Sequence, residues 1–115
     1  MDDNLNTKDA KTIGIIELHN IDHETGKDMF IDVRKKEEWD EGHIEWFTHI
    51  PLHEIKNHLD EFKKHERVFF ICQSGGRSSM ASEILSEADV WNAYNVDGGI
   101  EEWKELGFPI VSPKV

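Results

Sequence analysis

The chain has 115 residues, of which 37% are hydrophobic and 32% are charged, with a formal net charge of -11 and a single cysteine. This length fits one domain with its own core, and the polar start and absence of an apolar run of about 20 residues predict neither a secretory signal nor a membrane span. The acidity argues against nucleic acid and anionic membranes as partners, and the lone cysteine rules out an internal disulfide and predicts a reducing, cytoplasmic location.

We expect a flexible tail at 1–10, a single domain over 11–111 and a second tail at 112–115. Within the domain, residues 11–28 carry weak structural signals. Residues 11–21 are ambiguous between strand and helix from their pattern alone. The acidic segment 22–28 contains a glycine, but its spacing does not match a calcium-binding loop, so we interpret it as a connection.

Met29–Val33 is a nearly continuous apolar run, which is typical of a strand buried on both faces of a parallel sheet. Asp32 interrupts this run, and a buried carboxylate needs hydrogen bonds or a charged partner. We expect Arg34 to pair with Glu37 or Glu38 and to fix the following turn. A short helix should then follow over 35–41 and end at a glycine.

Seven histidines are scattered along the chain, and their spacing does not favour a metal site. Pro51 separates His49 from His53, and His53 and His58 miss the zinc-protease spacing by one residue. His43 has no evident triad partner, so we interpret it as a hydrogen-bonded structural residue. No metal and no cofactor are predicted.

Two large aromatic residues, Trp46 and Phe47, follow His43 closely. They either pack locally or form a docking surface near the functional site. A short strand is expected at 50–52, followed by a helix over 52–62 whose apolar residues recur at intervals of three and four.

The segment Val68–Ser79 has the pattern of a strand, a tight loop and a helix, with Cys72 at the mouth of the loop. Backbone N–H groups and the positive end of the next helix converge at such a position and favour an anion, including a thiolate. A free thiol has a pKa of about 8.5, and lowering it to about 7 would ionise about half of it at neutral pH. We expect Arg77 to be the neighbouring cation, and Ser78 or Ser79 to cap the helix.

The loop itself indicates the size of the anion. Gly75 and Gly76 allow the backbone to approach a bound group closely. Four residues separate Cys72 from Arg77, whereas a cysteine-based phosphatase loop has five. The smaller cradle is suited to a terminal sulfur or a compact anion.

Beyond the loop, a helix should run to about Ser86, a strand should cover 93–96, and a glycine turn should begin a final helix. Alternating strands and helices with short connections predict an α/β fold, with a parallel sheet covered on both sides. Ligands of such sheets bind beyond the carboxyl ends of the strands, which is where Cys72 is expected.

Several motifs resemble, in order, those of the single-domain rhodanese family, over about residues 28–110. They are Asp32-Val33-Arg34, Glu38-Trp39, Gly42-His43-Ile44, Ile50-Pro51-Leu52, Cys72-Gln73-Ser74-Gly75-Gly76-Arg77-Ser78, Val96-Asp97-Gly98-Gly99-Ile100, Trp103, Gly107 and Pro109. The resemblance implies a three-layer α/β/α fold around a parallel sheet of about five strands. The sequence departs from the family pattern at Glu45–Thr48, where small residues are usual.

The same resemblance implies a sulfurtransferase in which Cys72 carries a persulfide. The sulfur would come from thiosulfate or a low-molecular-weight persulfide and pass to a thiophilic acceptor, including a protein thiol. The loop residues Gln73, Ser74, Gly75, Gly76, Arg77 and Ser78 would bind the substrate, and Asp32, Arg34, Gly98 and Gly99 would support them. A non-catalytic or sulfur-carrier module acting through a protein partner stays open, as does a phosphatase or arsenate-reductase relative. The sequence leaves the oligomeric state open.

Overall fold

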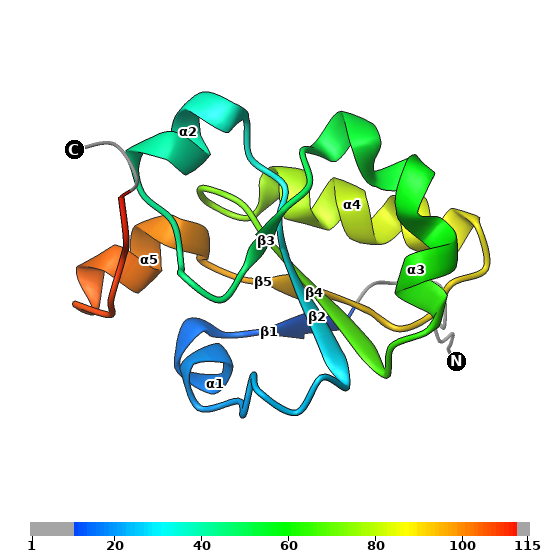
Figure 1. The fold of residues 1–115 in the computed structure, drawn as a ribbon, viewed down its shortest axis with the longest axis horizontal. Helices are drawn as coiled ribbons and strands as arrows, with labels where there is room; N and C mark the ends of the chain where they lie inside the picture. The colour runs from blue at the N-terminus through cyan, green and yellow to red at the C-terminus, as the bar shows by residue number, and fades with distance from the viewer. Residues whose placement is uncertain (1–10, 113–115) are drawn as a thin grey trace, which may run out of the picture.

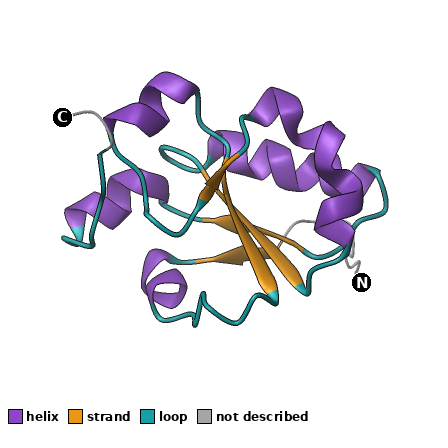
Figure 2. Ribbon diagram, viewed as in Figure 1, coloured by secondary structure: helices purple, strands orange, loops and turns teal. Residues whose placement is uncertain are grey.

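The computed structural model describes residues 11–112, so the predicted tails lie outside the described residues except for Ser112. Five strands form one parallel sheet in the order β1-β5-β4-β2-β3 (Figures 1 and 2). The strands are β1 (Lys11–Ile13), β2 (Asp28–Asp32), β3 (Thr48–His49), β4 (Arg67–Ile71) and β5 (Ala93–Val96).

Helices cover both faces of this sheet, which confirms the predicted α/β fold (Figure 1). They are α1 (Ile15–His19), α2 (Lys36–Glu41), the 3-10 helix η1 (Leu52–His58), α3 (Leu59–Lys63), α4 (Gly76–Glu87) and α5 (Gly99–Glu105). Helix α4 lies over one face with η1 and α3, and α1 and α5 lie over the other.

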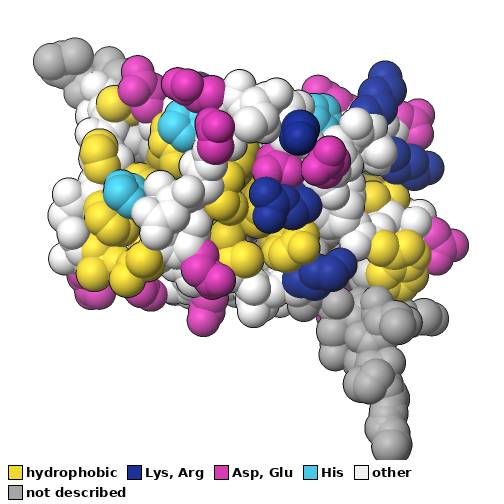
Figure 3. All heavy atoms as spheres, turned by 90° about the horizontal axis from the view of Figure 1, so that it is seen from below, with side chains coloured by type: hydrophobic (Ala, Val, Ile, Leu, Met, Phe, Trp, Pro, Cys, Tyr) yellow, Lys and Arg dark blue, Asp and Glu magenta, His cyan; other side chains and the backbone are white. Residues whose placement is uncertain are grey.

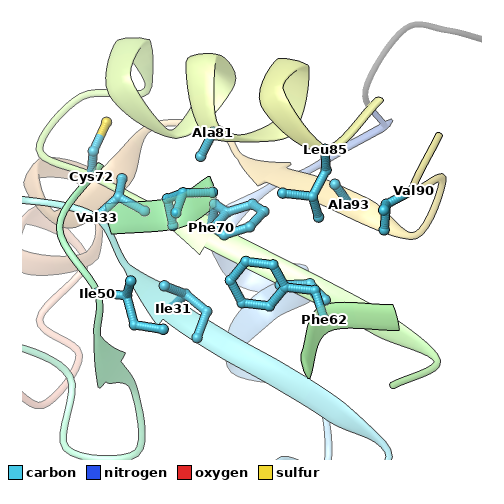
Figure 4. Close-up of a cluster of buried hydrophobic side chains, with 12 residues drawn as sticks. Ile31, Val33, Ile50, Phe62, Phe70, Cys72, Ala81, Leu85, Val90 and Ala93 are labelled. Atoms are coloured by element: carbon cyan, nitrogen blue, oxygen red, sulfur yellow. The ribbon is translucent and has the colours of Figure 1, made fainter. Parts of the chain in front are cut away.

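The alternation of side chains along the central strands builds two hydrophobic clusters. Phe70 and Cys72 point to the α4 side, where they join the cluster shown in Figure 4. Phe69 and Ile71 point to the opposite side, toward α1 and α5. Residues 68–72 are thus buried on both faces of the sheet. Phe30 and Ile31 of β2 are likewise buried in opposite clusters, which confirms the expectation for the apolar run at 29–33.

Two boundaries differ from the sequence expectation. The short strand predicted at 50–52 lies at Thr48–His49, although the chain still follows β2 through hydrogen bonds from the amides of Ile50 and Leu52. The single helix predicted over 52–62 is η1 followed by α3. Pro51 separates the strand from η1 and has no N–H to donate to a ladder.

The aromatic pair Trp46 and Phe47 packs locally. Phe47 is buried, and Trp46 stacks on His23 and meets Phe30 edge to face. Hydrophobic side chains, with histidines among them, also gather on the face seen in Figure 3. Among residues 11–112, no helix has both the length and the apolar character needed to cross a membrane.

Candidate active site

Cys72 directly follows β4, and the chain turns there into α4. Its side chain is 1% exposed and lies beside Val33 at one end of the cluster in Figure 4. The amide of Gly75 donates a hydrogen bond to the Cys72 Sγ at 3.0 Å, and the Ser78 Oγ lies 3.4 Å from the same sulfur. The segment 72–78, called the cysteine loop below, therefore wraps around the sulfur with its donors turned inward.

These donors control the ionisation of the thiol. Burial raises the pKa of Cys72, but the Ser78 hydroxyl and the amides of Ser78, Gly75 and Ser74 together outweigh it. The net pKa of Cys72 lies below its ordinary value. Hydrogen bonds to the charged form have this effect because they are stronger to a thiolate than to a thiol.

Neither serine caps α4, contrary to the prediction. The N-cap is Gly75, whose φ of 121° is one that glycine adopts with little strain. The amide of Ser79 donates to the Gly75 carbonyl oxygen at 3.1 Å, and the Ser78 hydroxyl is also within 3.1 Å of that oxygen. Ser78 is instead fully buried, and its hydroxyl contacts the Cys72 sulfur.

Arg77 is engaged by a carboxylate rather than left facing the sulfur. Its guanidinium donates to both oxygens of Glu38, at 2.6 and 2.9 Å, and so ties the start of α4 to α2. This contact lowers the pKa of Glu38 to about 2. Glu38 raises the pKa of Arg77, and the charge of an ionised Cys72 raises it to a smaller degree.

Arg34 pairs with Asp32, which corrects the expectation that it would pair with Glu37 or Glu38. Both side chains are buried, and their closest N–O distance is 2.9 Å. Arg34 also donates to the Gly42 carbonyl at 2.7 Å and to the Gln73 Oε1 at 3.3 Å. The pair thus connects the end of β2 to the cysteine loop.

Helix α5 is hydrogen-bonded to the backbone of the cysteine loop. The amide of Ile100 donates to the Cys72 carbonyl at 2.9 Å, and the amide of Glu101 donates to the Gln73 carbonyl at 3.0 Å. A Cβ on Gly99 would lie only 2.4 Å from the Gln73 oxygen, whereas one on Gly98 would meet Glu102 of its own helix. Gly99 therefore packs directly against the backbone of the loop.

A cavity of about 820 Å³ opens beside the cysteine loop, bordered on that side by Arg34 and Arg77. Its other lining residues come from the segment 33–37, which leads into α2, and from the segment 49–54, which runs from β3 into η1. They are Val33, Lys35, Lys36, Glu37, His49, Pro51, Leu52, His53 and Glu54. The lining combines an apolar part with cationic and titratable groups.

The histidines near this region are held by structural contacts. His43 Nδ1 lies 2.8 Å from the Trp39 carbonyl oxygen, and its ring stacks on Trp39, in agreement with the structural role predicted for it. His49 Nε2 lies 2.8 Å from the Arg34 carbonyl oxygen. Across the described part of the chain, no three histidine, cysteine or acidic side chains are grouped as metal ligands.

The chain matches a known protein family over most of its length. The rhodanese-like domain matches residues 16–106, which include the whole sheet after β1 and the cysteine loop. The chain belongs to the rhodanese family. Its structure is similar to that of a rhodanese-like domain protein from Staphylococcus aureus, with a TM-score of 0.73 and 35% identity over 89% of this chain and 99% of that one.

Curated relatives of this rhodanese chain carry two kinds of name. A protein from Allochromatium vinosum named "Sulfurtransferase" is 33% identical over 86 residues, which are 75% of this chain and 80% of that protein. "Putative sulfur carrier protein YrkF" from Bacillus subtilis is 34% identical over 73 residues, which are 64% of this chain. The matched region spans only 40% of YrkF and 61% of a second Bacillus subtilis relative, YqhL.

Two contacts of this rhodanese site were not found by sequence reasoning. Glu38 was expected near Arg34, but its partner is Arg77, 39 positions away along the chain. Asn95 was not singled out, yet its Oδ1 contacts the Ser78 hydroxyl. The available signal for Asn95 was a polar residue inside an otherwise apolar strand at 93–96.

Proposed function

We propose that this protein transfers a sulfane sulfur through a persulfide on Cys72. The donor is thiosulfate or a low-molecular-weight persulfide, and the acceptor is a thiophilic group. The observation that carries this proposal is the inward-facing set of donors around the Cys72 sulfur, which lowers the pKa of that thiol. The thiolate is the nucleophilic form of cysteine, and a persulfide anion would use the same donors.

In the first step, the Cys72 thiolate attacks the outer sulfur of thiosulfate. A sulfur–sulfur bond forms to Cys72 while the original one breaks, and sulfite leaves with the electron pair. The charges balance, because the Cys72 thiolate and the thiosulfate dianion give the Cys72 persulfide anion and the sulfite dianion. Sulfite needs no proton to leave, so no general acid is required.

In the second step, the acceptor thiol gives its proton to the Cys72 persulfide anion, and the resulting acceptor thiolate attacks the outer sulfur of the protonated persulfide. The bond between the two sulfurs breaks, Cys72 leaves as a thiolate, and the proton remains on the transferred sulfur. The amides of the cysteine loop stabilise the departing anion as they stabilise the resting one. Arg77 holds the loop in position through Glu38 and adds positive charge nearby.

The size of the cavity beside the cysteine loop favours an acceptor larger than thiosulfate. Its volume of about 820 Å³ is in the range of sites for drug-sized ligands. Lys35 and Lys36 line it despite the strongly acidic composition of the chain, and Pro51 and Leu52 provide an apolar wall. A thiol attached to an anionic molecule, or presented on a protein segment, fits this lining.

The direct test is loading with thiosulfate followed by intact-mass measurement. The reduced protein should release sulfite in a burst, gain the mass of one sulfur atom and lose it on treatment with a mild thiol reductant. Cys72→Ser should fold normally and gain no sulfur. Absence of sulfur on the wild-type protein after both thiosulfate and a small persulfide would refute the proposal.

A sulfur-carrier role is the second candidate, and the name of the relative YrkF favours it. The two roles differ in turnover. An enzyme releases sulfite continuously when thiosulfate and a small thiol are both present, whereas a carrier stops after one sulfur and discharges only to its protein partner. The number of sulfite molecules released per Cys72 therefore separates them.

A further inference from the structure

A buried row of three polar groups runs from Cys72 into β5. The Ser78 Oγ lies 3.4 Å from the Cys72 sulfur, contacts the Asn95 Oδ1, and is 3.1 Å from the Gly75 carbonyl oxygen. The exposed fractions of Cys72, Ser78 and Asn95 are 1%, 0% and 8%, so water has little access to replace any of these contacts. The Ser78 hydroxyl therefore has three neighbours in a nearly dry site.

A serine hydroxyl carries only one proton to donate. In the observed arrangement Asn95 and Gly75 both present oxygen acceptors to it. When the proton points at either oxygen, the sulfur can contact the Ser78 Oγ only by donating its own S–H. This arrangement suits the thiol form of Cys72.

The thiolate form requires the opposite direction of donation. The Ser78 hydroxyl must then turn its proton to the sulfur, which leaves its oxygen lone pairs facing the Asn95 Oδ1. Two acceptors in contact repel each other. Rotation of the Asn95 amide by half a turn removes the conflict, because its Nδ2 then donates to the Ser78 Oγ within the same volume.

We propose that Asn95 is a positioning residue whose amide reverses its orientation when Cys72 ionises. In the ionised state, Nδ2 of Asn95 donates to the Ser78 Oγ, and the Ser78 hydroxyl donates to the sulfur. This inference rests on the proposed role of Cys72 as a thiolate nucleophile, and it assigns a specific function to an otherwise unexplained polar side chain in β5.

The row from Cys72 to Asn95 affects ionisation because Ser78 influences the pKa of the Cys72 thiol. Burial raises the pKa of Cys72, and the Ser78 hydroxyl makes the largest of the contributions that lower it. The charged groups around the loop are Arg77 on α4 with its partner Glu38 on α2, and the Asp32–Arg34 pair after β2. None of these groups needs to move when Asn95 is replaced.

The test is a double-mutant cycle on the pKa of Cys72, measured from the pH dependence of its alkylation by iodoacetamide. Asn95→Leu keeps the approximate volume but removes both hydrogen-bonding atoms, and Ser78→Ala removes the hydroxyl. We expect Asn95→Leu to raise the pKa by about one unit, since hydrogen bonds to charged groups have energies of roughly this size. In the Ser78→Ala background the same substitution should cause no measurable shift.

A purely structural role for Asn95 would shift the pKa equally in both backgrounds, and that result would overturn the inference. So would an unchanged pKa in the single variant Asn95→Leu. Asn95→Ala provides a second cycle should the leucine disturb folding, which circular dichroism monitors. No sulfur donor is used, so failure of this cycle is distinguishable from failure of sulfur loading in the wild-type protein.

Discussion

Gly99→Ala should destabilise the protein because the added methyl group would clash with the backbone of the cysteine loop. Gly99 has a φ of +62°, and a Cβ added there would lie 2.4 Å from the Gln73 oxygen and 2.6 Å from the Cys72 oxygen. Both neighbours are backbone atoms, so no side chain can rotate away to relieve the contact. The loop and the first turn of α5 would have to separate.

The cost has two parts. The left-handed backbone conformation costs an alanine about 1–2 kcal/mol relative to glycine. Overpacking against the loop adds about 1–3 kcal/mol. The sum is about 2–5 kcal/mol of unfolding free energy, a large share of the stability of a small domain. Separation of the two segments would also lengthen the hydrogen bonds from Ile100 and Glu101 to the loop carbonyls.

Gly107→Ala is the matched control, because Gly107 also has a positive φ, of +80°, but a Cβ there meets nothing within 4 Å. Urea unfolding should show a loss of about 1–2 kcal/mol for the control and a clearly larger loss for Gly99→Ala. Alkylation of Cys72 near neutral pH should slow only in Gly99→Ala, because its loop amides move away from the sulfur. Equal stabilities for the two variants, with unchanged alkylation, would refute this reasoning.

Asp32→Asn should cost about 3–5 kcal/mol in urea unfolding because it leaves the buried guanidinium of Arg34 without a counter-charge, whereas Asp28→Asn, whose partner Arg67 is 42% exposed and can still reach water, should cost about 1 kcal/mol or less; equal losses would contradict this. Hydrogen bonds from Arg77 lower the pKa of Glu38 to about 2. The pair therefore contributes stability above the unfolded carboxyl pKa of about 4.3 and loses it as pH falls through about 2. Wild-type protein should exceed Glu38→Gln in stability by about 1 kcal/mol near neutral pH, and a gap that stays constant down to about pH 2 would be inconsistent with this ion pair.

The sheet and the place of Cys72 were predictable because they depend on local patterns. The apolar run at 29–33 and the strand at 93–96 correspond closely to β2 and β5. Strand β3 was misplaced because two residues at a sheet edge carry no periodicity. The apolar stripe of 52–62 could not separate η1 from α3, since spacings of three and four fit either kind of helix.

The partners of the charged side chains were less accessible from sequence. Arg34 and Arg77 were predicted to belong to the site, but the carboxylate that Arg77 contacts depends on how α2 lies against α4. Glu38 lies close to Arg34 in sequence and yet bonds Arg77. The cap was wrong for a related reason, since Ser78 faces the sulfur and Asn95, and only the folded positions of α4 and β5 determine this.

The pKa of Cys72 in the wild-type protein is the most direct test of the account. It can be measured from the pH dependence of alkylation, with Cys72→Ser as the blank. Donors from Ser78 and the loop amides predict a pKa below that of a free cysteine thiol measured under the same conditions. A value at or above the ordinary one would contradict the claim that the loop stabilises a thiolate, and with it the proposed transfer of sulfur.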